Sequence, residues 1–424
     1  MPLSMWIRNA ILTALLSVVL GLATPAQAQD YPHPLFEKAQ AALTAGDLDA
    51  AQKYLQKGLK KVPDHANAWV NLGNIHLMRE NPDEATSAFQ AAIALDPRHF
   101  LAMNGLGAAA LQRGETEPAI EWFLSAVEAE PQYATPLVNL GDVGLILGRP
   151  EFAIKYYALA LQVDPKHPKA AWKLCQLHRM AGVPDQGLAY LGPALAAHPD
   201  HVDLLLEAGS TALALERPRE ALVHLSRAAD RDSKRLDVMR TLALTAMQLG
   251  DWPMAERAYR AALDLKDDSA DLHFEIGQMY YKMGLAGDSE VRFERALKHL
   301  SAAMTLEPNR ADVKSQMADI FEEQGDIKSA VEAWEAAIAD DSNYCPALNN
   351  LGRRKMVEDD VAAATVLFDK CLEAQPNFSM ARLNRGLLYA KTGRCGQARS
   401  ELEPFTTGES AFSAQVSSAL QTCQ

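Results

Sequence analysis

A 34-residue pattern recurs along almost the whole of this 424-residue chain. In the stretch 66–99 the small or apolar residues that define it are Trp69, Leu72, Gly73, Ala85, Phe89, Ala92 and Pro97. Adding 34 gives Met103, Leu106, Gly107, Ala119, Phe123, Ala126 and Pro131, and adding 34 again gives Leu137, Leu140, Gly141, Ala153, Tyr157, Ala160 and Pro165. The sequence therefore predicts an array of repeats, which has no single globular core.

Each recurring position has a physical role in a pair of helices. With residue 66 as position 1, the apolar positions 4, 7, 24 and 27 recur at helical three- and four-residue steps. Positions 8 and 20 carry small residues, as close contact between crossing helices requires. Proline at position 32 ends the second helix. Glycine at position 15 is suited to ending the first helix, and it occurs as Gly46, Gly114, Gly148, Gly182, Gly250, Gly284, Gly325 and Gly393.

This pattern resembles the tetratricopeptide repeat, a helix–turn–helix unit of 34 residues. The resemblance implies an all-α fold, a right-handed superhelical solenoid of about eleven helix pairs over residues 32–412. A helix pair cannot bury its apolar face alone, so each pair needs stacked neighbours. The amphipathic segment Ala411–Gln421 is predicted to cover the last repeat, and residues 413–424 form the predicted capping helix. The predicted repeats begin at residues 32, 66, 100, 134, 168, 202, 236, 270, 311, 345 and 379.

The eighth repeat contains an insertion. It starts in register with Ile276 and Gly277, but its second half is displaced by seven residues. Seven residues correspond to nearly two helical turns, so the apolar stripe keeps its phase. We therefore expect a lengthened second helix that is capped by Asp288 or Ser289, runs to about Met304 and projects beyond the solenoid edge.

The first 28 residues do not fit the repeat. Arg8 is the only charged side chain before residue 30, and the apolar run Ile11–Ala23 follows it. Together with the small residues that end at Ala28, this is typical of a secretory signal peptide that is cleaved after Ala28. The run is 13 residues long, shorter than the roughly 17–25 of a spanning helix. We expect export to a bacterial periplasm without membrane insertion; a retained anchor is the alternative.

The net charge of −13 disfavours nonspecific binding to nucleic acids and to anionic lipid surfaces. One basic cluster is an exception. It consists of Lys53, Lys57, Lys60 and Lys61 in the second helix of the first repeat. A solvated terminal face is its simplest interpretation.

Five cysteines in an exported protein favour pairing. Cys345 is at position 1 and Cys371 at position 27 of one repeat, where antiparallel helices bring the start of one beside the end of the other. Cys395 is near the start of the second helix of the last repeat, and Cys423 lies in the capping segment. We therefore expect the disulfides Cys345–Cys371 and Cys395–Cys423, with Cys175 free and buried. No Cys-x-x-Cys spacing supports a metal site.

No catalytic motif is present in the sequence, so we predict neither an enzyme nor a cofactor or metal. Four histidines share position 34, but neighbouring helices lie about 8–10 Å apart, too far for coordination of one metal. A polar residue ahead of the first helix is the better interpretation. These histidines are His65, His99, His167 and His201.

The resemblance implies that the first helices line a groove through positions 2, 5, 6, 9, 12 and 13. The candidate groove residues are Asn71, Asn74, Asn104, Asn139, Lys169, Trp172, Lys173, Arg179, Arg240, Phe274, Tyr281, Asn349, Asn350, Arg353 and Asn384. Asn71, Asn139, Asn350 and Asn384 share position 6, similar to the asparagine ladder that holds a peptide backbone in the O-GlcNAc transferase repeat domain. The ladder is interrupted in the middle repeats.

Large apolar residues occupy the groove positions in the middle of the chain. They are either partner anchors or packing residues between helices. They comprise Trp172, Met180, Leu206, Leu213, Met247, Phe274 and Tyr281. A carboxylate clamp of the chaperone-binding type is only partly matched, by Asn139, Lys169 and Lys173. Since Asn104 and Ala108 stand where lysine and asparagine are expected, we predict that this clamp is absent.

These features predict a non-enzymatic, exported scaffold that binds a partner protein or an extended peptide in its groove. One alternative is an accessory factor for cell-envelope assembly, such as polysaccharide export. Another is a carbohydrate-binding or glycan-handling protein. Its only candidate residues are Phe274, Glu275, Tyr281, Asp319 and Glu322. We interpret the acidic cluster of Asp319, Glu322 and Glu323 as a solvated face.

Overall fold

The computed structural model describes residues 33–266, 268–287, 289–406 and 412–423. Every regular element in these ranges is a helix, so the predicted all-α fold is confirmed. The predicted signal peptide at residues 1–28, the repeat start at residue 32, the proposed cap Asp288, and residues 411 and 424 of the C-terminal segment lie outside them. The chain forms two compact units, Met1–Asp232 and Ser233–Gln424, which we call unit 1 and unit 2.

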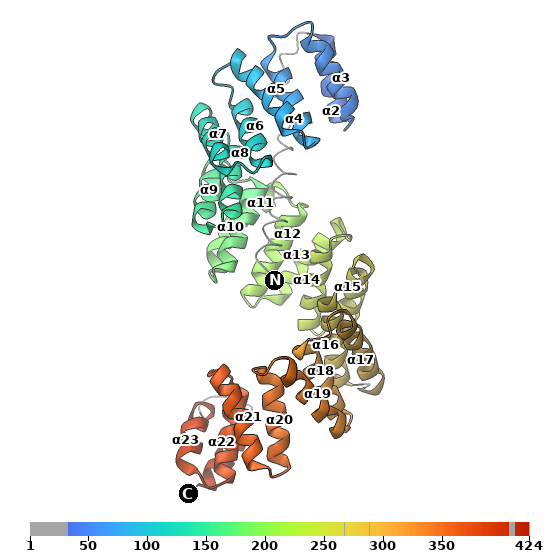
Figure 1. The fold of residues 1–424 in the computed structure, drawn as a ribbon, viewed down its shortest axis with the longest axis vertical. Helices are drawn as coiled ribbons and strands as arrows, with labels where there is room; N and C mark the ends of the chain where they lie inside the picture. The colour runs from blue at the N-terminus through green and yellow to red at the C-terminus, as the bar shows by residue number, and fades with distance from the viewer. Residues whose placement is uncertain (1–32, 267, 288, 407–411, 424) are drawn as a thin grey trace. The chain divides into compact units, whose positions relative to one another are not determined.

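Unit 1 is a stack of antiparallel helix pairs, and the even-numbered helix of each pair is its first helix (Figure 1). Each second helix packs on its own partner and on the first helix of the next pair within the unit. The helices are α2 (Pro34–Thr44), α3 (Leu48–Leu59), α4 (Ala66–Met78), α5 (Pro82–Leu95), α6 (Phe100–Gln112), α7 (Thr116–Ala129), α8 (Thr135–Ile146), α9 (Pro150–Val163), α10 (Pro168–Met180), α11 (Pro184–Ala197), α12 (Val202–Ala214) and α13 (Pro218–Arg231).

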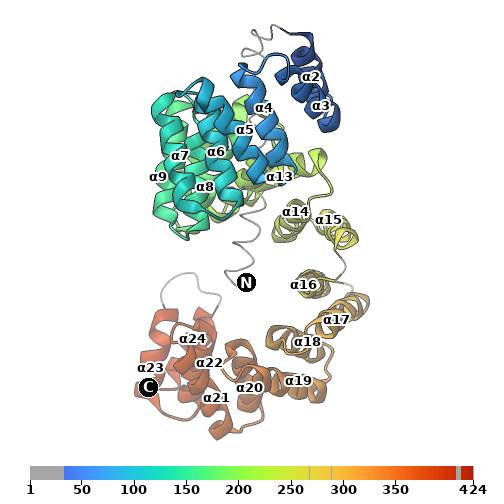
Figure 2. The same ribbon diagram turned by 45° about the horizontal axis from the view of Figure 1, so that its top comes forward.

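Unit 2 continues the same plan and ends with an extra helix, α24, packed against α22 and α23 (Figure 2). Its elements are α14 (Leu236–Gln248), α15 (Trp252–Leu265), α16 (Ala270–Ala286), α17 (Ser289–Leu306), α18 (Ala311–Glu323), α19 (Ile327–Asp340), α20 (Cys345–Val357), α21 (Val361–Ala374), α22 (Ser379–Lys391), α23 (Cys395–Leu402), the 3-10 turn η2 (Glu403–Phe405) and α24 (Ser413–Gln421). Val416 of α24 is fully buried against Leu383 and Leu402.

Within a pair, a glycine at position 8 faces a large side chain at position 24. A Cβ added to Gly73 would lie 2.6 Å from the ring of Phe89, and one added to Gly141 would lie 2.5 Å from Tyr157. Both aromatic rings are fully buried. The small residue therefore allows the helices to approach until the aromatic side chain fills the space between them.

The turn between the two helices requires a left-handed residue at position 15. Gly46, Gly114 and Gly325 have φ values of 75°, 79° and 79° there. Where glycine is missing, Glu80 and Glu216 adopt the same region, with φ values of 58° and 57°. The prediction that glycine ends the first helix is thus confirmed at seven of its eight positions, and other residues accept strain at this position.

Gly284 is the exception, and the prediction for it was wrong. Helix α16 continues through Gly284 to Ala286, and the residue with positive φ is Gly287 instead, at φ 150° and ψ 166°, an extended conformation that differs from the left-handed one of the other turns. Helices α16 and α17 contain 17 and 18 residues, compared with 13 and 14 in α18 and α19. The insertion therefore lengthens both helices, not the second helix alone.

The lengthened pair repeats its own crossing contact. A Cβ on Gly277 would lie 2.7 Å from Leu300, and one on Gly284 would lie 2.5 Å from Phe293. Gly284 follows Gly277 by seven residues, and Phe293 precedes Leu300 by seven. Because the helices are antiparallel, the insertion adds a second contact of glycine against a large side chain, which explains why Gly284 is inside a helix.

Candidate functional site

Apart from tyrosine and tryptophan, buried polar side chains among the described residues are confined almost entirely to first helices. They are Asn71, Asn104, Asn139, Asp142, Lys173, Glu207, Thr211, Thr245, Ser315, Asn349 and Asn384; the remaining one, His99, directly precedes α6. No second helix contributes to this set. Burying polar groups costs free energy unless they are hydrogen-bonded, so the partners of these side chains determine whether the arrangement is stable. We call the side chains at positions 2, 5, 6, 9, 12 and 13 of the first helices the first-helix face of each unit.

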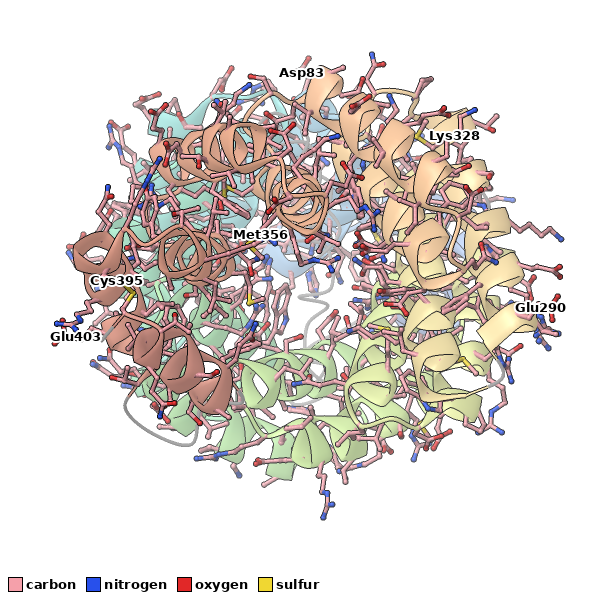
Figure 3. All side chains as sticks on the ribbon, turned by 90° about the horizontal axis from the view of Figure 1, so that it is seen from below. Asp83, Glu290, Lys328, Met356, Cys395 and Glu403 are labelled. Atoms are coloured by element: carbon pink, nitrogen blue, oxygen red, sulfur yellow. A yellow bond between two sulfur atoms is a disulfide. The ribbon has the colours of Figure 1, made fainter. Side chains whose placement is uncertain are left out.

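In unit 2 the two sides of the helix pairs can be followed in Figure 3. Met356, at position 12 of α20, lies on the side of the first helices, whereas Glu290 of α17 and Lys328 of α19 lie at the opposite edge. Glu290 and Lys328 are exposed, and Met356 is half-buried.

Asparagines on the first-helix faces bond to one another across neighbouring helices. In unit 1, Asn139 Nδ2 of α8 donates to Asn104 Oδ1 of α6 at 2.9 Å, and both side chains are buried. Asn71 of α4 is also buried, whereas Asn74 is half-buried. A guest peptide that used the predicted ladder would therefore have to compete with an existing amide–amide bond.

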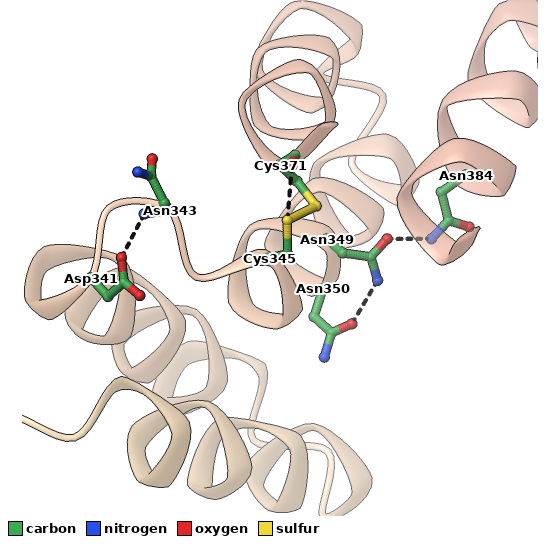
Figure 4. Close-up of a disulfide and its surroundings, with 7 residues drawn as sticks. All are labelled: Asp341, Asn343, Cys345, Asn349, Asn350, Cys371 and Asn384. Atoms are coloured by element: carbon green, nitrogen blue, oxygen red, sulfur yellow. Dashed lines mark hydrogen bonds between the residues drawn. A yellow bond between two sulfur atoms is a disulfide. The ribbon is translucent and has the colours of Figure 1, made fainter. Parts of the chain in front are cut away.

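Unit 2 contains a longer amide chain, shown in Figure 4. Asn384 Nδ2 donates to Asn349 Oδ1 at 2.9 Å, and Asn349 Nδ2 donates to Asn350 Oδ1 at 3.0 Å. Asn350 Nδ2 then donates to Asp319 Oδ1 of α18 at 2.8 Å, and Trp334 Nε1 donates to the same oxygen at 3.1 Å. Asp319, which the sequence suggested to be a solvated residue, is half-buried at the end of this network.

Asp142 is the centre of the charged part of the unit 1 face. Its side chain is 4% exposed; Oδ1 accepts a hydrogen bond of 2.6 Å from Tyr157 Oη, and Oδ2 lies 2.5 Å from Lys169 Nζ. Burial, and then the Asp142 charge, raise the pKa of Tyr157 well above its usual value. Lys169 is thus paired within the protein, which leaves the partial carboxylate clamp without one of its two cations.

Lys173 is the other cation of that partial clamp. It is buried beside Trp172, with Nζ 4.2 Å from the centre of the indole ring. Burial lowers the pKa of Lys173, while the carboxylate of Asp142 acts in the opposite direction. Because Ala108 has no polar side chain and Asn104 bonds to Asn139, the geometry does not assemble a carboxylate clamp.

Arg179 connects α10 to α12. Its Nε and Nη2 donate to Glu207 Oε1 and Oε2 at 2.8 and 3.0 Å, and Thr211 Oγ1 donates to Glu207 Oε1 at 3.1 Å. Hydrogen bonding to Glu207 raises the pKa of Arg179. Next to this fixed pair, Met180 is 59% exposed at position 13. Unit 1 therefore presents an accessible apolar side chain beside rigidly held charges.

Arginines also connect first helices in unit 2. Arg240 Nε of α14 donates to Glu275 of α16 at 2.8 Å, and Arg353 of α20 pairs with Glu322 of α18. The guanidinium carbon of Arg310 lies 5.3 Å from the ring of Phe274. Phe274 is therefore a partly covered ring rather than a free anchor.

Tyr281 lies close to the acidic end of the unit 2 face. Burial, together with the carboxylates of Asp319, Glu323 and Glu322, raises the pKa of Tyr281 to about 12. Burial also raises the pKa of Asp319. The phenol therefore stays protonated at neutral pH and can donate a hydrogen bond.

A recurrent contact between positions 9 and 24 was not predicted from the sequence. Tyr157 and Trp334, both at position 24, donate to Asp142 and Asp319, both at position 9 of the same repeats. The signal that would have revealed this contact is an acidic residue at position 9 together with a tyrosine or tryptophan at position 24 of the same repeat. Tyr259 is also at position 24, but its own repeat has Leu244 at position 9. The buried hydroxyl of Tyr259 has no hydrogen-bond partner.

The predicted cysteine pairs lie within disulfide distance. Cys345 and Cys371 are joined with Cα atoms 4.8 Å apart, and Cys395 and Cys423 with Cα atoms 5.3 Å apart (Figure 4 shows the first pair). Cys175 is free and buried, as expected from the sequence. Burial raises the pKa of the Cys175 thiol to about 11, so this thiol is unreactive at neutral pH.

The histidines at position 34 act as helix caps. The Nδ1 atoms of His65, His99 and His167 accept hydrogen bonds from the backbone amides of Ala68, Ala102 and Ala170 at 3.1, 3.4 and 3.4 Å. The interpretation of a polar residue ahead of the first helix is confirmed for these three, while His201 makes no such bond. In the part of the chain that the structure describes, no cluster of three or more His, Cys, Asp or Glu side chains is arranged to bind a metal ion.

None of the helices in the described residues is both long enough and apolar enough to span a membrane.

Family comparisons agree with the repeat pattern. Models described as "Tetratricopeptide repeat" match residues 36–97, 79–134 and 134–167, and one described as "TPR repeat" matches residues 245–284. Among solved structures, yeast Tom70 is similar with a TM-score of 0.50 and 14% sequence identity, over 92% of this chain and 94% of that chain. At this identity the likeness concerns the fold alone.

Two curated relatives from bacteria are similar over part of their length. Protein FlbA of Caulobacter vibrioides is 26% identical over 162 residues, which cover 38% of this chain and 26% of FlbA. Type IV pilus assembly protein PilF of Pseudomonas aeruginosa is 26% identical over 147 residues, which cover 32% of this chain and 53% of PilF. The chain thus spans between about a quarter and a half of these relatives.

Proposed function

Because the chain is a tetratricopeptide repeat protein, we propose that it is a non-enzymatic scaffold, exported to the periplasm, whose first-helix faces bind a partner protein or an extended peptide. The family fold supports protein–protein interaction. Export, the groove residues and the partner are parts of the proposal.

The concentration of buried polar side chains on the first helices carries this proposal. A core needs no asparagine, lysine or glutamate for stability, since buried polar groups at best recover their lost hydration. In this chain these groups form bonded networks on one side of the helix pairs in each unit. Such networks fix the orientation of neighbouring exposed side chains, and preorganised side chains lose less entropy when a partner binds.

Side chains of equal exposure on opposite sides of the pairs allow a direct test. Met180 and Val357 share position 13 of first helices and are 59% and 64% exposed, whereas Val223 and Val366 share position 22 of second helices and are 59% and 65% exposed. We expect a photocrosslinking residue at position 180 or 357 to capture a defined partner in intact cells, and the same residue at 223 or 366 not to do so. Capture at the second-helix positions alone would refute the proposal.

The double substitution Trp172→Ala with Phe274→Ala tests the same site by loss of binding. Trp172 and Phe274 are both half-buried, so each ring still has an exposed part that a partner can contact. Truncating an aromatic side chain at a binding hot spot typically costs about 2 kcal/mol or more. We expect weaker recovery of the captured partner from both faces. Unchanged recovery, with folding verified by circular dichroism, would show that the partner is bound elsewhere.

Export is supported by the signal-like sequence at residues 1–28 and by the two cysteine pairs at disulfide distance. The test is cell fractionation with N-terminal sequencing. We expect the mature protein in the periplasmic fraction with Gln29 as its first residue. A chain that keeps Met1 and remains in the cytoplasm contradicts this part of the proposal.

A second candidate is an accessory role in assembling cell-envelope structures. The similarity to a type IV pilus assembly protein favours it. The partner captured at positions 180 and 357 separates the two candidates, because an assembly factor binds a component of an envelope structure. Loss of that structure on gene deletion supports the second candidate, and its normal assembly rules it out.

A further inference from the structure

Helix α3 belongs to the first helix pair of unit 1 (Figure 1), and it carries a basic patch. We define the patch as Lys53, Lys57, Lys60 and Lys61, all of which are exposed. Lys53 and Lys57 are one helical turn apart, and Lys60 and Lys61 follow in the turn at the end of the helix. Because of the 3.6-residue period, Lys53 and Lys57 lie opposite the buried side chains Leu55 and Leu59.

None of the other pairs in unit 1 has basic residues at all four corresponding positions; α13 comes nearest, with Arg227 and Arg231. These four lysines occupy positions 22, 26, 29 and 30 of their repeat. The same positions are Ser87, Ala91, Ala94 and Leu95 in α5, and Glu121, Ser125, Glu128 and Ala129 in α7. A solvated helix surface requires charge of either sign, so the general properties of the repeat do not explain four lysines on one face.

The lysines of the patch are not matched by carboxylates in the structure. No ion pair within the described residues involves any of the four; Asp49 of the same helix pairs with Arg79. Asp64, in the loop after the helix, is the one carboxylate in residues 53–65. The remaining negative charge of the chain is distributed over several helix pairs, and ions screen it beyond about 8–10 Å.

We propose that the basic patch of α3 binds the surface of a membrane that contains anionic phospholipids. Exposed lysines attract such a surface with about 1 kcal/mol each near the headgroups, and their long stems allow the ammonium groups to reach phosphates while the backbone stays outside. Tyr54, which is half-buried and directly follows Lys53, is a residue type enriched at membrane interfaces.

Binding to vesicles tests the proposal with the full mature chain. We expect cosedimentation with vesicles of phosphatidylcholine mixed with phosphatidylglycerol, decreasing as salt is added, and none with phosphatidylcholine alone. Replacing all four lysines by glutamine lowers the partition coefficient by roughly 1000-fold, given about 1 kcal/mol from each lysine. Because the four side chains are exposed and unpaired, the variant keeps its fold, which circular dichroism verifies.

A matched control removes the same charge from other parts of unit 1. Arg98, Arg149, Lys166 and Arg219 are exposed, and the variant with glutamine at these four positions retains its binding if the patch is responsible. Equal loss in both variants indicates attraction by overall charge and overturns the proposal. So does equal binding to both kinds of vesicle. Absence of binding to either kind of vesicle also overturns the proposal. If a photocrosslinking residue in place of Lys57 then captures an acidic protein, the patch is assigned to a protein partner instead.

Discussion

The fourth and seventh helix pairs, one in each unit, place a tyrosine at the same position with opposite results. Tyr157 of α9 donates its hydroxyl hydrogen to Asp142 at 2.6 Å. Tyr259 of α15 is equally buried, but Leu244 occupies the position of Asp142, and its hydroxyl has no partner. The ring satisfies the packing in both pairs. The comparison shows that the shape of the core and the bonding of its polar atoms are separate requirements.

The units also differ in their covalent links. Both disulfide pairs lie in unit 2, and unit 1 contains only the free thiol of Cys175. Unit 2 therefore has a stabilising contribution that acts through its unfolded state, whereas unit 1 depends on packing and hydrogen bonds.

The largest predicted effect comes from removing a disulfide. Replacing Cys345 and Cys371 by alanine opens a loop of 26 residues, which costs about 3 kcal/mol. We expect faster hydrogen exchange within residues 345–402 and unchanged exchange in unit 1, while Cys175→Ala has a smaller, local effect on α10. If mass spectrometry of the native protein counts five free thiols, the pairs are reduced and the comparison of the units fails.

A smaller effect is expected from Tyr157→Phe. It removes the hydrogen bond to a buried carboxylate, which costs about 1–3 kcal/mol. Tyr259→Phe is the matched control, since it removes a hydroxyl without a partner, and we expect it to be neutral or slightly stabilising. Chemical denaturation, monitored in each unit by hydrogen exchange, measures the stability change of both variants. Equal destabilisation by the two substitutions would disprove the role of position 9.

The pH dependence of unit 2 provides the third test. Burial, followed by the charge of His273, lowers the pKa of His299 to about 4, and the two Nδ1 atoms are 3.0 Å apart. The unfolded chain then binds more protons than the folded chain between pH 6.5 and 4, so stability decreases as the pH falls through this range. Since the ring is only partly buried, we expect the loss to be on the order of 1 kcal/mol after solvent screening.

His299→Gln isolates this contribution. The variant and the native chain are compared by thermal unfolding at pH 7 and pH 5, with exchange in unit 1 as the internal reference. We expect the native chain to lose more stability in unit 2 than the variant does. A variant with the same pH dependence would assign the titration to other groups.

The smallest effect concerns the turns. Glu80 and Glu216 occupy the left-handed conformation that glycine occupies at Gly114, and a Cβ at Gly114 would meet no atom within 4 Å. We expect Glu80→Gly and Glu216→Gly to stabilise unit 1 by roughly 0.5–1 kcal/mol, because relief of backbone strain exceeds the greater entropy of the unfolded glycine.

Asp359 is the corresponding residue in unit 2, and its carboxylate pairs with Lys391 at 2.7 Å. Asp359→Gly removes this ion pair, so we expect less gain than at Glu80. A loss of stability in Glu80→Gly would show that the side chain, not the backbone, determines the choice of residue at this position. Thermal unfolding of the three variants provides the measurement.

The sequence predicts contacts that a fixed repeat position determines. Gly73 against Phe89, the left-handed turn at Gly114 and the proximity of Cys345 to Cys371 all follow from the register, because each needs only the geometry of one helix pair. Gly284 was assigned to the turn because periodicity cannot distinguish an insertion in one helix from an insertion shared by both.

The bonding on the first-helix faces could not be predicted from the register alone. Asn104 and Asn139 are at positions 5 and 6 of successive repeats, and whether their amides face a groove or each other depends on side-chain rotamers and on the distance between helices. Whether the Arg310 guanidinium lies over the Phe274 ring also depends on side-chain rotamers. The sequence therefore predicts which residues form the candidate site, but not which of them are already hydrogen-bonded or covered by other side chains of the protein.

The paired contacts of Gly277 with Leu300 and Gly284 with Phe293 have a consequence for how such arrays change during evolution. An extension by one heptad brings its own interdigitating side chains, so a hairpin can grow in a discrete step without exposing unpacked surface. The eighth repeat, with 41 residues instead of 34, has grown by one such step.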